Sequence, residues 1–127
     1  MKRIRSLLAV VLVLVVMPAA AAVEKRLVSR QSIDHGAYLV RIAGCHDCHT
    51  PGWGQGNGNA PRARWLTGDV IGWQGPWGTT YAANLRLYMQ GLSEAQWVER
   101  ARKGSSRPPM PWYVFRDMTD YDLRAIY

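Results

Sequence analysis

Cysteine is nearly absent from this chain of 127 residues, which holds only Cys45 and Cys48, and phenylalanine occurs once. Two cysteines cannot build the network of disulfides that stabilises many small secreted domains. The sequence has no second C-x-x-C pair and no H-x-x-x-H pair, so the usual four ligands of a structural zinc site are lacking. Convincing alternation of apolar and polar residues, which is typical of strands, is lacking as well. These absences favour a helical protein in which the two cysteines serve neither in a disulfide network nor in a structural zinc site.

Long apolar runs are confined to the N-terminus, where the run from Leu7 to Val16 is uninterrupted. Three basic residues precede this run, and a stretch of small residues that suits cleavage after Ala22 follows it. This pattern is that of a secretory signal peptide over residues 1–22, and it predicts export to the periplasm. The run is shorter than the roughly 20 residues that span a bilayer, which favours cleavage. An uncleaved N-terminal anchor, or peripheral membrane association, is the alternative.

Basic residues outnumber acidic ones, but the excess is small once the signal peptide is removed. The net charge is +7 for the whole chain and +4, from 13 basic and 9 acidic residues, for residues 23–127. A balance this mild does not indicate a nucleic-acid-binding protein. The length that remains, about 105 residues, suits one small domain. We therefore assign residues 23–32 to an N-terminal linker and residues 33–127 to a single domain.

Both cysteines belong to the segment Cys45-His46-Asp47-Cys48-His49, which is a C-x-x-C-H motif. This motif attaches haem covalently: both thiols become thioethers and the histidine binds the iron. The spacing places the two sulfur atoms about one helical turn apart, within reach of two vinyl groups on one porphyrin edge. We predict one haem c held by Cys45 and Cys48, with His49 as the proximal iron ligand. A thioredoxin-like redox pair or a plain local disulfide is the alternative. A thioredoxin-like pair follows a strand, however, and the segment before Cys45 is predicted to be a helix.

Helical patterns occur in three places along the domain. The first runs from about residue 33 to residue 43, with Ser32 or Asp34 as its N-cap and an apolar stripe formed by Tyr38, Leu39 and Ile42. The second covers residues 94–103 and the third begins after residue 119, and each starts with a capping box and a hydrophobic staple. These patterns predict an all-α fold of three or so short helices, with long loops wrapped around the haem.

The segment from residue 51 to residue 81 is rich in glycine and tryptophan, a composition typical of an ordered loop with aromatic anchors. We expect its tryptophans to cover the porphyrin and Arg62 or Arg64 to pair with the haem carboxylates. A backbone carbonyl, for instance that of Pro61, is expected to orient His49 by accepting a hydrogen bond from its second ring nitrogen. The alternative is that the tryptophans fill a small core and the arginines are solvated.

The sixth ligand of the iron decides between an electron carrier and a haem enzyme. Met110 is the preferred candidate, because the segment Pro108-Pro109-Met110-Pro111 holds a flexible thioether on a backbone whose φ angles are nearly fixed. The alternatives are an open site or one of three other side chains, namely Met89, Met118 and His35. We expect His46, inside the motif, to face solvent.

With these motifs, the chain resembles class I c-type cytochromes, and among them the haem domains that accompany bacterial periplasmic dehydrogenases. The similarity spans about residues 33–127. It rests on these segments: Gly36-Ala37-Tyr38-Leu39, Cys45-His46-Asp47-Cys48-His49-Thr50, Gly78-x-x-Tyr81-Ala82-x-Asn84, Met110-Pro111-Trp112, Met118-Thr119-Asp120 and Asp122-Leu123. The resemblance implies a cytochrome c-like fold, thioethers at both cysteines, His49 as the proximal ligand and Met110 as the distal one.

The resemblance also implies how the two ends of the domain meet. An N-terminal helix would cross the C-terminal one, with Gly36 and Tyr38 at the crossing, opposite Tyr121 or Ala125. A glycine inside a helix costs about 1 kcal/mol relative to alanine, so the use expected of Gly36 is the close approach of another helix.

Outer-sphere electron transfer is the function that a haem with histidine and methionine ligands implies, because no substrate bond is made or broken there. We therefore expect an electron carrier and not an enzyme. Its redox partner proteins would be a dehydrogenase on one side and a terminal oxidase or another cytochrome on the other. The alternative is a haem sensor or a peroxidase-like enzyme with an open sixth position on the iron.

Overall fold

The structure is a computed structural model that describes residues 29–127. The signal peptide predicted for residues 1–22 and the first part of the predicted linker lie outside the described residues. Residues 35–127 form one compact unit, and the few described residues before them belong to a second unit. Within residues 29–127, no helix combines the length and the apolar character needed to cross a bilayer.

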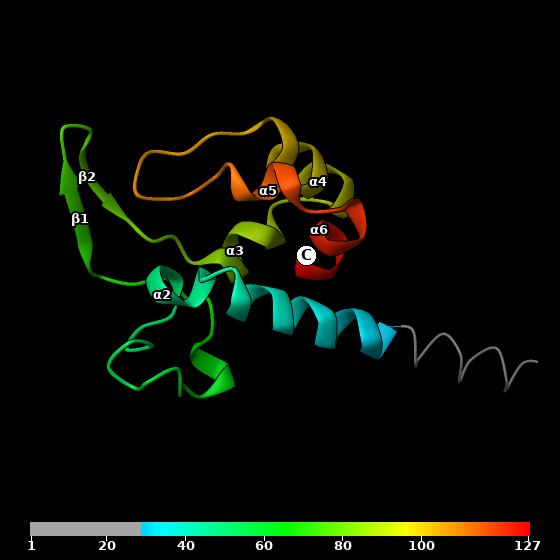
Figure 1. The fold of residues 1–127 in the computed structure, drawn as a ribbon, viewed down its shortest axis with the longest axis horizontal. Helices are drawn as coiled ribbons and strands as arrows, with labels where there is room; N and C mark the ends of the chain where they lie inside the picture. Colours follow the sequence, from blue (N-terminus) through cyan, green and yellow to red (C-terminus); the bar gives the residue numbers. More distant parts are fainter. Residues whose placement is uncertain (1–28) are drawn as a thin grey trace, which may run out of the picture. The chain divides into compact units, whose positions relative to one another are not determined.

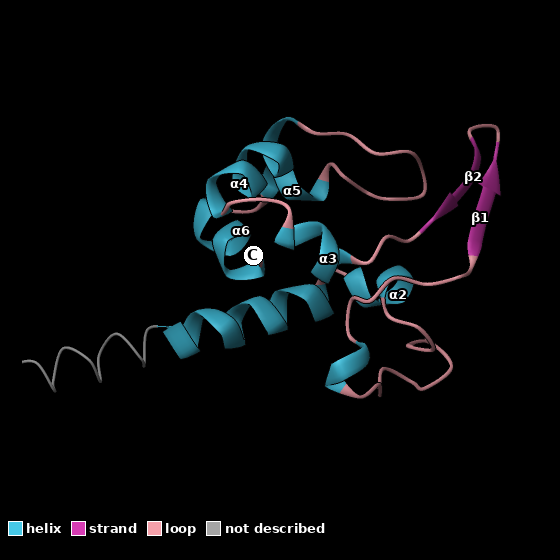
Figure 2. Ribbon diagram, turned by 180° about the vertical axis from the view of Figure 1, so that it is seen from behind, coloured by secondary structure: helices cyan, strands magenta, loops and turns pink. Residues whose placement is uncertain are grey.

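Short helices and one hairpin make up the described chain (Figures 1 and 2). Residues 29–42 are helical, and the later elements are α2 (Cys45–His49), the 3-10 helix η1 (Arg62–Arg64), the strands β1 (Gly72–Gly75) and β2 (Gly78–Tyr81), α3 (Leu85–Gln90), α4 (Glu94–Lys103), α5 (Val114–Asp117) and α6 (Asp120–Ile126). The prediction of an all-α fold with three helices is therefore wrong in part. Among residues 29–127 there are six α-helices and a small antiparallel sheet.

The two helices with the strongest start motifs are confirmed. In α4, the Ser93 hydroxyl accepts from the amide of Gln96, and the Gln96 side chain accepts from the amide of Ser93. In α6, Thr119 and Asp122 make the same reciprocal pair. These capping boxes satisfy amide groups that the first helical turn leaves without partners.

The core of the domain lies between α4, α5 and α6. It consists of Trp97, Ala101, Phe115 and Leu123, which are all at most 7% exposed. The Trp97 indole nitrogen donates to the Leu123 carbonyl oxygen at 2.7 Å, so the one polar atom of this side chain is satisfied inside the core. Leu92 and Met118, which directly precede the N-caps of α4 and α6, pack against this cluster, as expected of the hydrophobic staples at these helix starts.

The first helix is already helical at residue 29, so neither Ser32 nor Asp34 is its N-cap, and it enters the range that we assigned to the linker. Its buried stripe within the main unit also differs from the prediction. Gly36, Leu39 and Val40 are buried, whereas Tyr38 and Ile42 are 56% and 61% exposed. The predicted stripe follows residue hydrophobicity, but the buried one follows the i, i+3, i+4 spacing of a helix face.

This helix packs against α6, and Gly36 lies at the contact. A Cβ atom on Gly36 would overlap the carbonyl group of Ala125, so the backbones approach more closely than any other residue would allow. Next to it, the His35 ring nitrogen Nε2 and Asp122 Oδ1 are 2.7 Å apart. The predicted contact between Gly36 and Ala125 is confirmed, while Tyr38 stays largely exposed.

The hairpin of β1 and β2 was not predicted. Its register pairs Trp73 with Thr80 and Gly75 with Gly78, and Gly78 adopts a φ of 90° after the turn. The strand sequence Gly-Trp-Gln-Gly has no alternation of apolar and polar residues, so periodicity could not reveal it. The hairpin forms because Pro76 in the turn and Gly78 directly after it suit a tight reversal of the chain.

Candidate functional site

The C-x-x-C-H motif forms α2, a single helical turn. Gly44, just before it, has a φ of 70°, a left-handed conformation that favours glycine and that bends the chain out of the preceding helix. Cys45 and Cys48 are not joined to each other by a disulfide. Burial raises the pKa of the Cys45 thiol to about 11 and also raises the pKa of Cys48. The motif follows a helix, whereas a thioredoxin-like pair follows a strand of a βαβ unit.

His49 is held in one orientation by a backbone carbonyl group. Its Nδ1 donates to the carbonyl oxygen of Ala83 at 2.8 Å. Because a carbonyl oxygen only accepts, Nδ1 carries the proton, and the lone pair of a neutral ring is on Nε2. Burial lowers the pKa of His49, although the bond to Ala83 opposes this, and so favours the neutral ring. The prediction of a backbone carbonyl acceptor is confirmed. The acceptor is the carbonyl of Ala83, whereas the sequence analysis suggested that of Pro61.

Two segments far along the chain hold this turn in place. The Thr50 hydroxyl accepts from the amide of Leu66 at 2.8 Å, and the His49 carbonyl accepts from the amide of Gly68 at 2.9 Å. Gly68 has a φ of 84°, and a Cβ atom there would lie 2.8 Å from the Ala82 carbonyl oxygen. The chain around Gly68 is therefore pressed against the segment that carries the acceptor for His49.

The position of the Ala83 carbonyl is also fixed from its other side. Asn84 caps α3, because its side chain accepts from the amide of Leu87 at 3.1 Å. In addition, the Leu85 amide donates to the Leu66 carbonyl at 2.9 Å. Asn84 is part of one of the segments on which the resemblance rests, so the sequence analysis had singled out this residue. It did not identify Gly68 as a residue that contacts residues 82–84.

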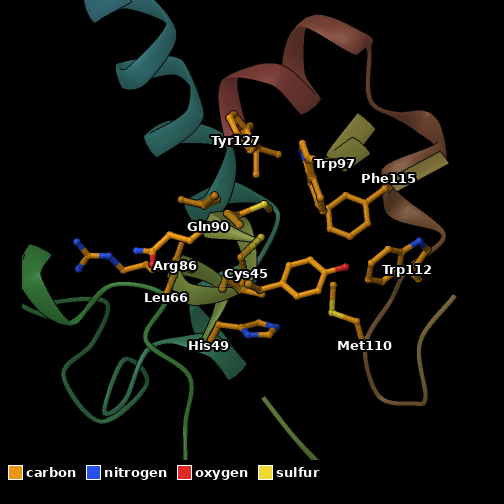
Figure 3. Close-up of a pocket in the computed structure, with 15 residues that line it drawn as sticks. Cys45, His49, Leu66, Arg86, Gln90, Trp97, Met110, Trp112, Phe115 and Tyr127 are labelled. Carbon is orange, nitrogen blue, oxygen red and sulfur yellow. The ribbon is translucent and has the colours of Figure 1, made fainter. Parts of the chain in front are cut away.

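Two adjoining cavities bring the predicted ligands together. The larger, of about 430 Å³, is lined by Cys45, His49 and Met110, and the smaller, of about 200 Å³, by Cys48, His49 and Met110. Figure 3 shows Cys45 and His49 on one side of the larger cavity and Met110 on the other. Most of its other walls are apolar and include Leu66, Leu85, Met89, Trp97, Phe115 and Ile126.

The other candidates for the sixth ligand lie elsewhere or in less direct positions. Met118 packs against the core and lines neither cavity, and His35 pairs with Asp122. Met89 lines the larger cavity only. Of the three methionines, Met110 alone shares both cavities with His49.

His46 does not face solvent, and this prediction was wrong. Its side chain is fully buried, and Nδ1 lies 2.7 Å from the Thr50 hydroxyl. The ring stacks on Trp53 with 4.1 Å between the centroids and meets the edge of Trp65 at 4.6 Å. Burial, and then the charge of Arg41, lower the pKa of His46. The loop after the motif folds back onto α2, and its aromatic rings cover the histidine.

Of the four tryptophans of residues 51–81, one lines a cavity. Trp53 and Trp65 cover His46 and line neither cavity, whereas Trp73 lines the smaller one. Arg62 lies over Trp65, 5.2 Å from the ring centroid, and like Arg64 lines neither cavity. The arginines that do line the cavities are Arg86 and Arg100.

Within residues 29–127, no group of three or more histidine, cysteine, aspartate or glutamate side chains is placed to hold a metal ion. A haem iron bound by histidine and methionine needs only one such side chain, so this finding does not bear on the predicted ligands. Comparison with known proteins gave no match to a family model, to a curated protein or to a solved structure.

Proposed function

We propose that this protein is a periplasmic mono-haem c-type cytochrome that carries single electrons between a dehydrogenase and a terminal oxidase or another cytochrome. The observation that supports the proposal is the common location of four side chains. The two cysteines of the motif, its histidine and Met110 line two adjoining cavities, although Met110 lies far along the chain from the motif. This is the donor set of a class I cytochrome, the family that the sequence resembles.

The cavities suit a haem in size and in chemistry. Volumes of about 430 and 200 Å³ fall, taken together, within the range of cofactor pockets. Their walls are largely apolar, as the faces of a porphyrin require. His49 has its Nδ1 occupied by Ala83, and its Nε2 forms no hydrogen bond with any described residue. A neutral imidazole oriented in this way is the usual haem ligand.

Each residue then has a role. Cys45 and Cys48 would hold the haem as thioethers, His49 would bind the iron through Nε2, and Met110 would bind it from the other side. The haem supplies one redox couple, Fe(III) and Fe(II), that exchanges a single electron. The thioether of Met110 favours the ferrous form and so raises the reduction potential.

The protein around these ligands keeps the site rigid and dry. The bond between His49 and Ala83 fixes the ring and prevents a change of tautomer, and the segment around Gly68 holds that carbonyl in place. The largely apolar walls would limit the water around the haem, so little would have to reorganise when the charge of the site changes. If His49 and Met110 both bound the iron, no iron position would be left for a substrate, and this would separate a carrier from a sensor or a peroxidase-like enzyme.

The intact mass of the exported protein tests the attachment. We expect the purified protein to be coloured and to have the mass of the processed chain plus one haem that survives unfolding. The oxidised form should show a weak sulfur-to-iron band in the red region, and the reduced form should not bind carbon monoxide unless it is unfolded. A colourless protein of unmodified mass would end the proposal. Haem without the red band, together with carbon monoxide binding, would support the open-site alternative instead.

A further inference from the structure

A second polar cluster lies outside both cavities, where the loop after the motif covers α2. Its centre is His46, which is fully buried and which the proposed function does not use. Trp53 stacks on its ring, and Trp65 meets the ring at an angle of 68°. The Nδ1 atom of His46 lies 2.7 Å from the Thr50 hydroxyl, while Nε2 has no hydrogen-bond partner among the described residues. Buried polar atoms without a partner are rare, so the direction of the bond to Thr50 needs an explanation.

The surroundings of Thr50 determine this direction. Its hydroxyl oxygen already accepts from the Leu66 amide at 2.8 Å, and Thr50 is only 1% exposed. Among the described residues, the acceptor that the hydroxyl proton can reach is His46 Nδ1. If Thr50 donates there, the proton of the neutral ring is on Nε2, next to the Trp65 ring, whose π face is a weak acceptor. The opposite direction leaves two groups without a partner, the hydroxyl proton and the lone pair of Nε2.

The bond to Thr50 is the first of a series that leads back to the proposed haem ligand. The Leu66 amide donates to Thr50, and the Leu66 carbonyl accepts from the Leu85 amide at 2.9 Å. Leu85 comes two residues after Ala83, whose carbonyl accepts from His49 Nδ1 at 2.8 Å. Without an acceptor for its proton, the Thr50 hydroxyl would have to turn, and its bond to the Leu66 amide would weaken.

We propose that His46 is a positioning residue for His49, the proposed iron ligand. By accepting the Thr50 proton, it keeps the hydroxyl oxygen in place as the acceptor of the Leu66 amide, and so it holds the segment that orients the ligand. This role rests on the proposed function. A hydrogen bond from Nδ1 makes an imidazole a stronger donor to a metal. A looser bond to Ala83 would therefore make His49 a weaker donor, which stabilises Fe(III) less and raises the reduction potential.

Two substitutions remove the hydrogen bond between His46 and Thr50, and two matched variants keep it. H46F leaves an aromatic ring on Trp53 but removes the acceptor, and T50V replaces the hydroxyl by a methyl group. T50S retains the hydroxyl, and W53F alters the stacking without removing the hydrogen bond. The measurement is the rate at which the His49 Nδ1 proton exchanges with solvent, followed by NMR on the reduced, isotope-labelled holoprotein.

We expect this proton to exchange about tenfold faster in H46F and T50V, and within about twofold of the wild-type rate in T50S and W53F. In H46F and T50V the equilibrium constant for reduction should also rise by about threefold. For one electron this is about 28 mV, since a tenfold change is about 59 mV.

The outcomes distinguish this role from the proposed function. A wild-type protein without haem contradicts the proposed function itself. Normal haem attachment, with the same exchange rate in H46F as in W53F, shows that His46 only fills space and contradicts the positioning role alone. Ring nitrogen chemical shifts that put the proton of His46 on Nδ1 would also overturn it. Should H46F yield no holoprotein, T50V decides: wild-type exchange and potential contradict the role, whereas the expected changes, reversed in T50S, support it.

Discussion

Replacement of Gly68 by alanine is the most direct test of how the histidine is held. Gly68 has a φ of 84°, a conformation that costs an alanine about 1–2 kcal/mol. The new Cβ would lie 2.8 Å from the Ala82 carbonyl oxygen and 2.9 Å from the Asn84 amide nitrogen, so the two segments must move apart. This movement weakens the bond between Gly68 and His49 or the one between His49 and Ala83, at about 1 kcal/mol.

Alanine also lowers the conformational entropy of the unfolded chain, which raises the free energy of unfolding by about 0.4–1 kcal/mol. The net expected loss for G68A is therefore about 2 kcal/mol in the free energy of unfolding. For a domain of this size, that corresponds to a fall in Tm of roughly 10 °C. Urea unfolding, followed by tryptophan fluorescence, measures the difference.

Gly52 provides the matched control. Its φ is 75°, but no heavy atom lies within 4 Å of a Cβ built on it. G52A should therefore lose only the conformational part, about 1 kcal/mol or less. The larger loss in G68A would then come from the contact with residues 82–84. Equal losses in the two variants would show that this contact does not hold the segment and would refute the reasoning.

Two further predictions concern the ligand and the acid stability of the domain. M110A should abolish the methionine-ligated spectrum and leave the haem attached. The control M118A should destabilise the core and leave the spectrum unchanged. An unaltered spectrum in M110A would refute the assignment of Met110. Hydrogen bonds from His35 and from the N-cap threonine lower the pKa of Asp122 from 3.8 to about 2. The stability that Asp122 contributes is thus fully present above about pH 4 and is lost as the pH falls towards 2, because the unfolded chain takes up the proton first. D122N should therefore lower the Tm at pH 5 but converge with the wild type at pH 2. A difference in Tm between D122N and the wild type that stays constant with pH would contradict this.

The parts of the fold that could be predicted are those determined by neighbours in sequence. The capping boxes of α4 and α6 join residues three positions apart, so each can be recognised from a few letters. Gly36 could be predicted because a glycine inside a helix has few reasons to be there other than a close contact.

The errors concern residues whose environment comes from distant parts of the chain. His46 is polar and lies in a turn, which favours exposure, but Trp53 and Trp65 cover it after the loop folds back. The acceptor for His49 is a backbone group, and any residue type can provide a carbonyl, so the sequence could not identify Ala83. The strands of the hairpin lack periodicity because two of the four residues in β1 are glycines.

The hairpin and the carbonyl that orients His49 belong to one continuous segment, but different contacts hold the two parts. At the base of the hairpin, the Asp69 amide donates to the Ala82 carbonyl at 3.2 Å, directly beside the contact of Gly68 with residues 82–84. Neither this hydrogen bond nor the close contact of Gly68 involves residues 70–81. The acceptor of His49 is therefore positioned from the base of the hairpin, while the apolar side chains of Val70, Trp73 and Tyr81 lie exposed beyond it.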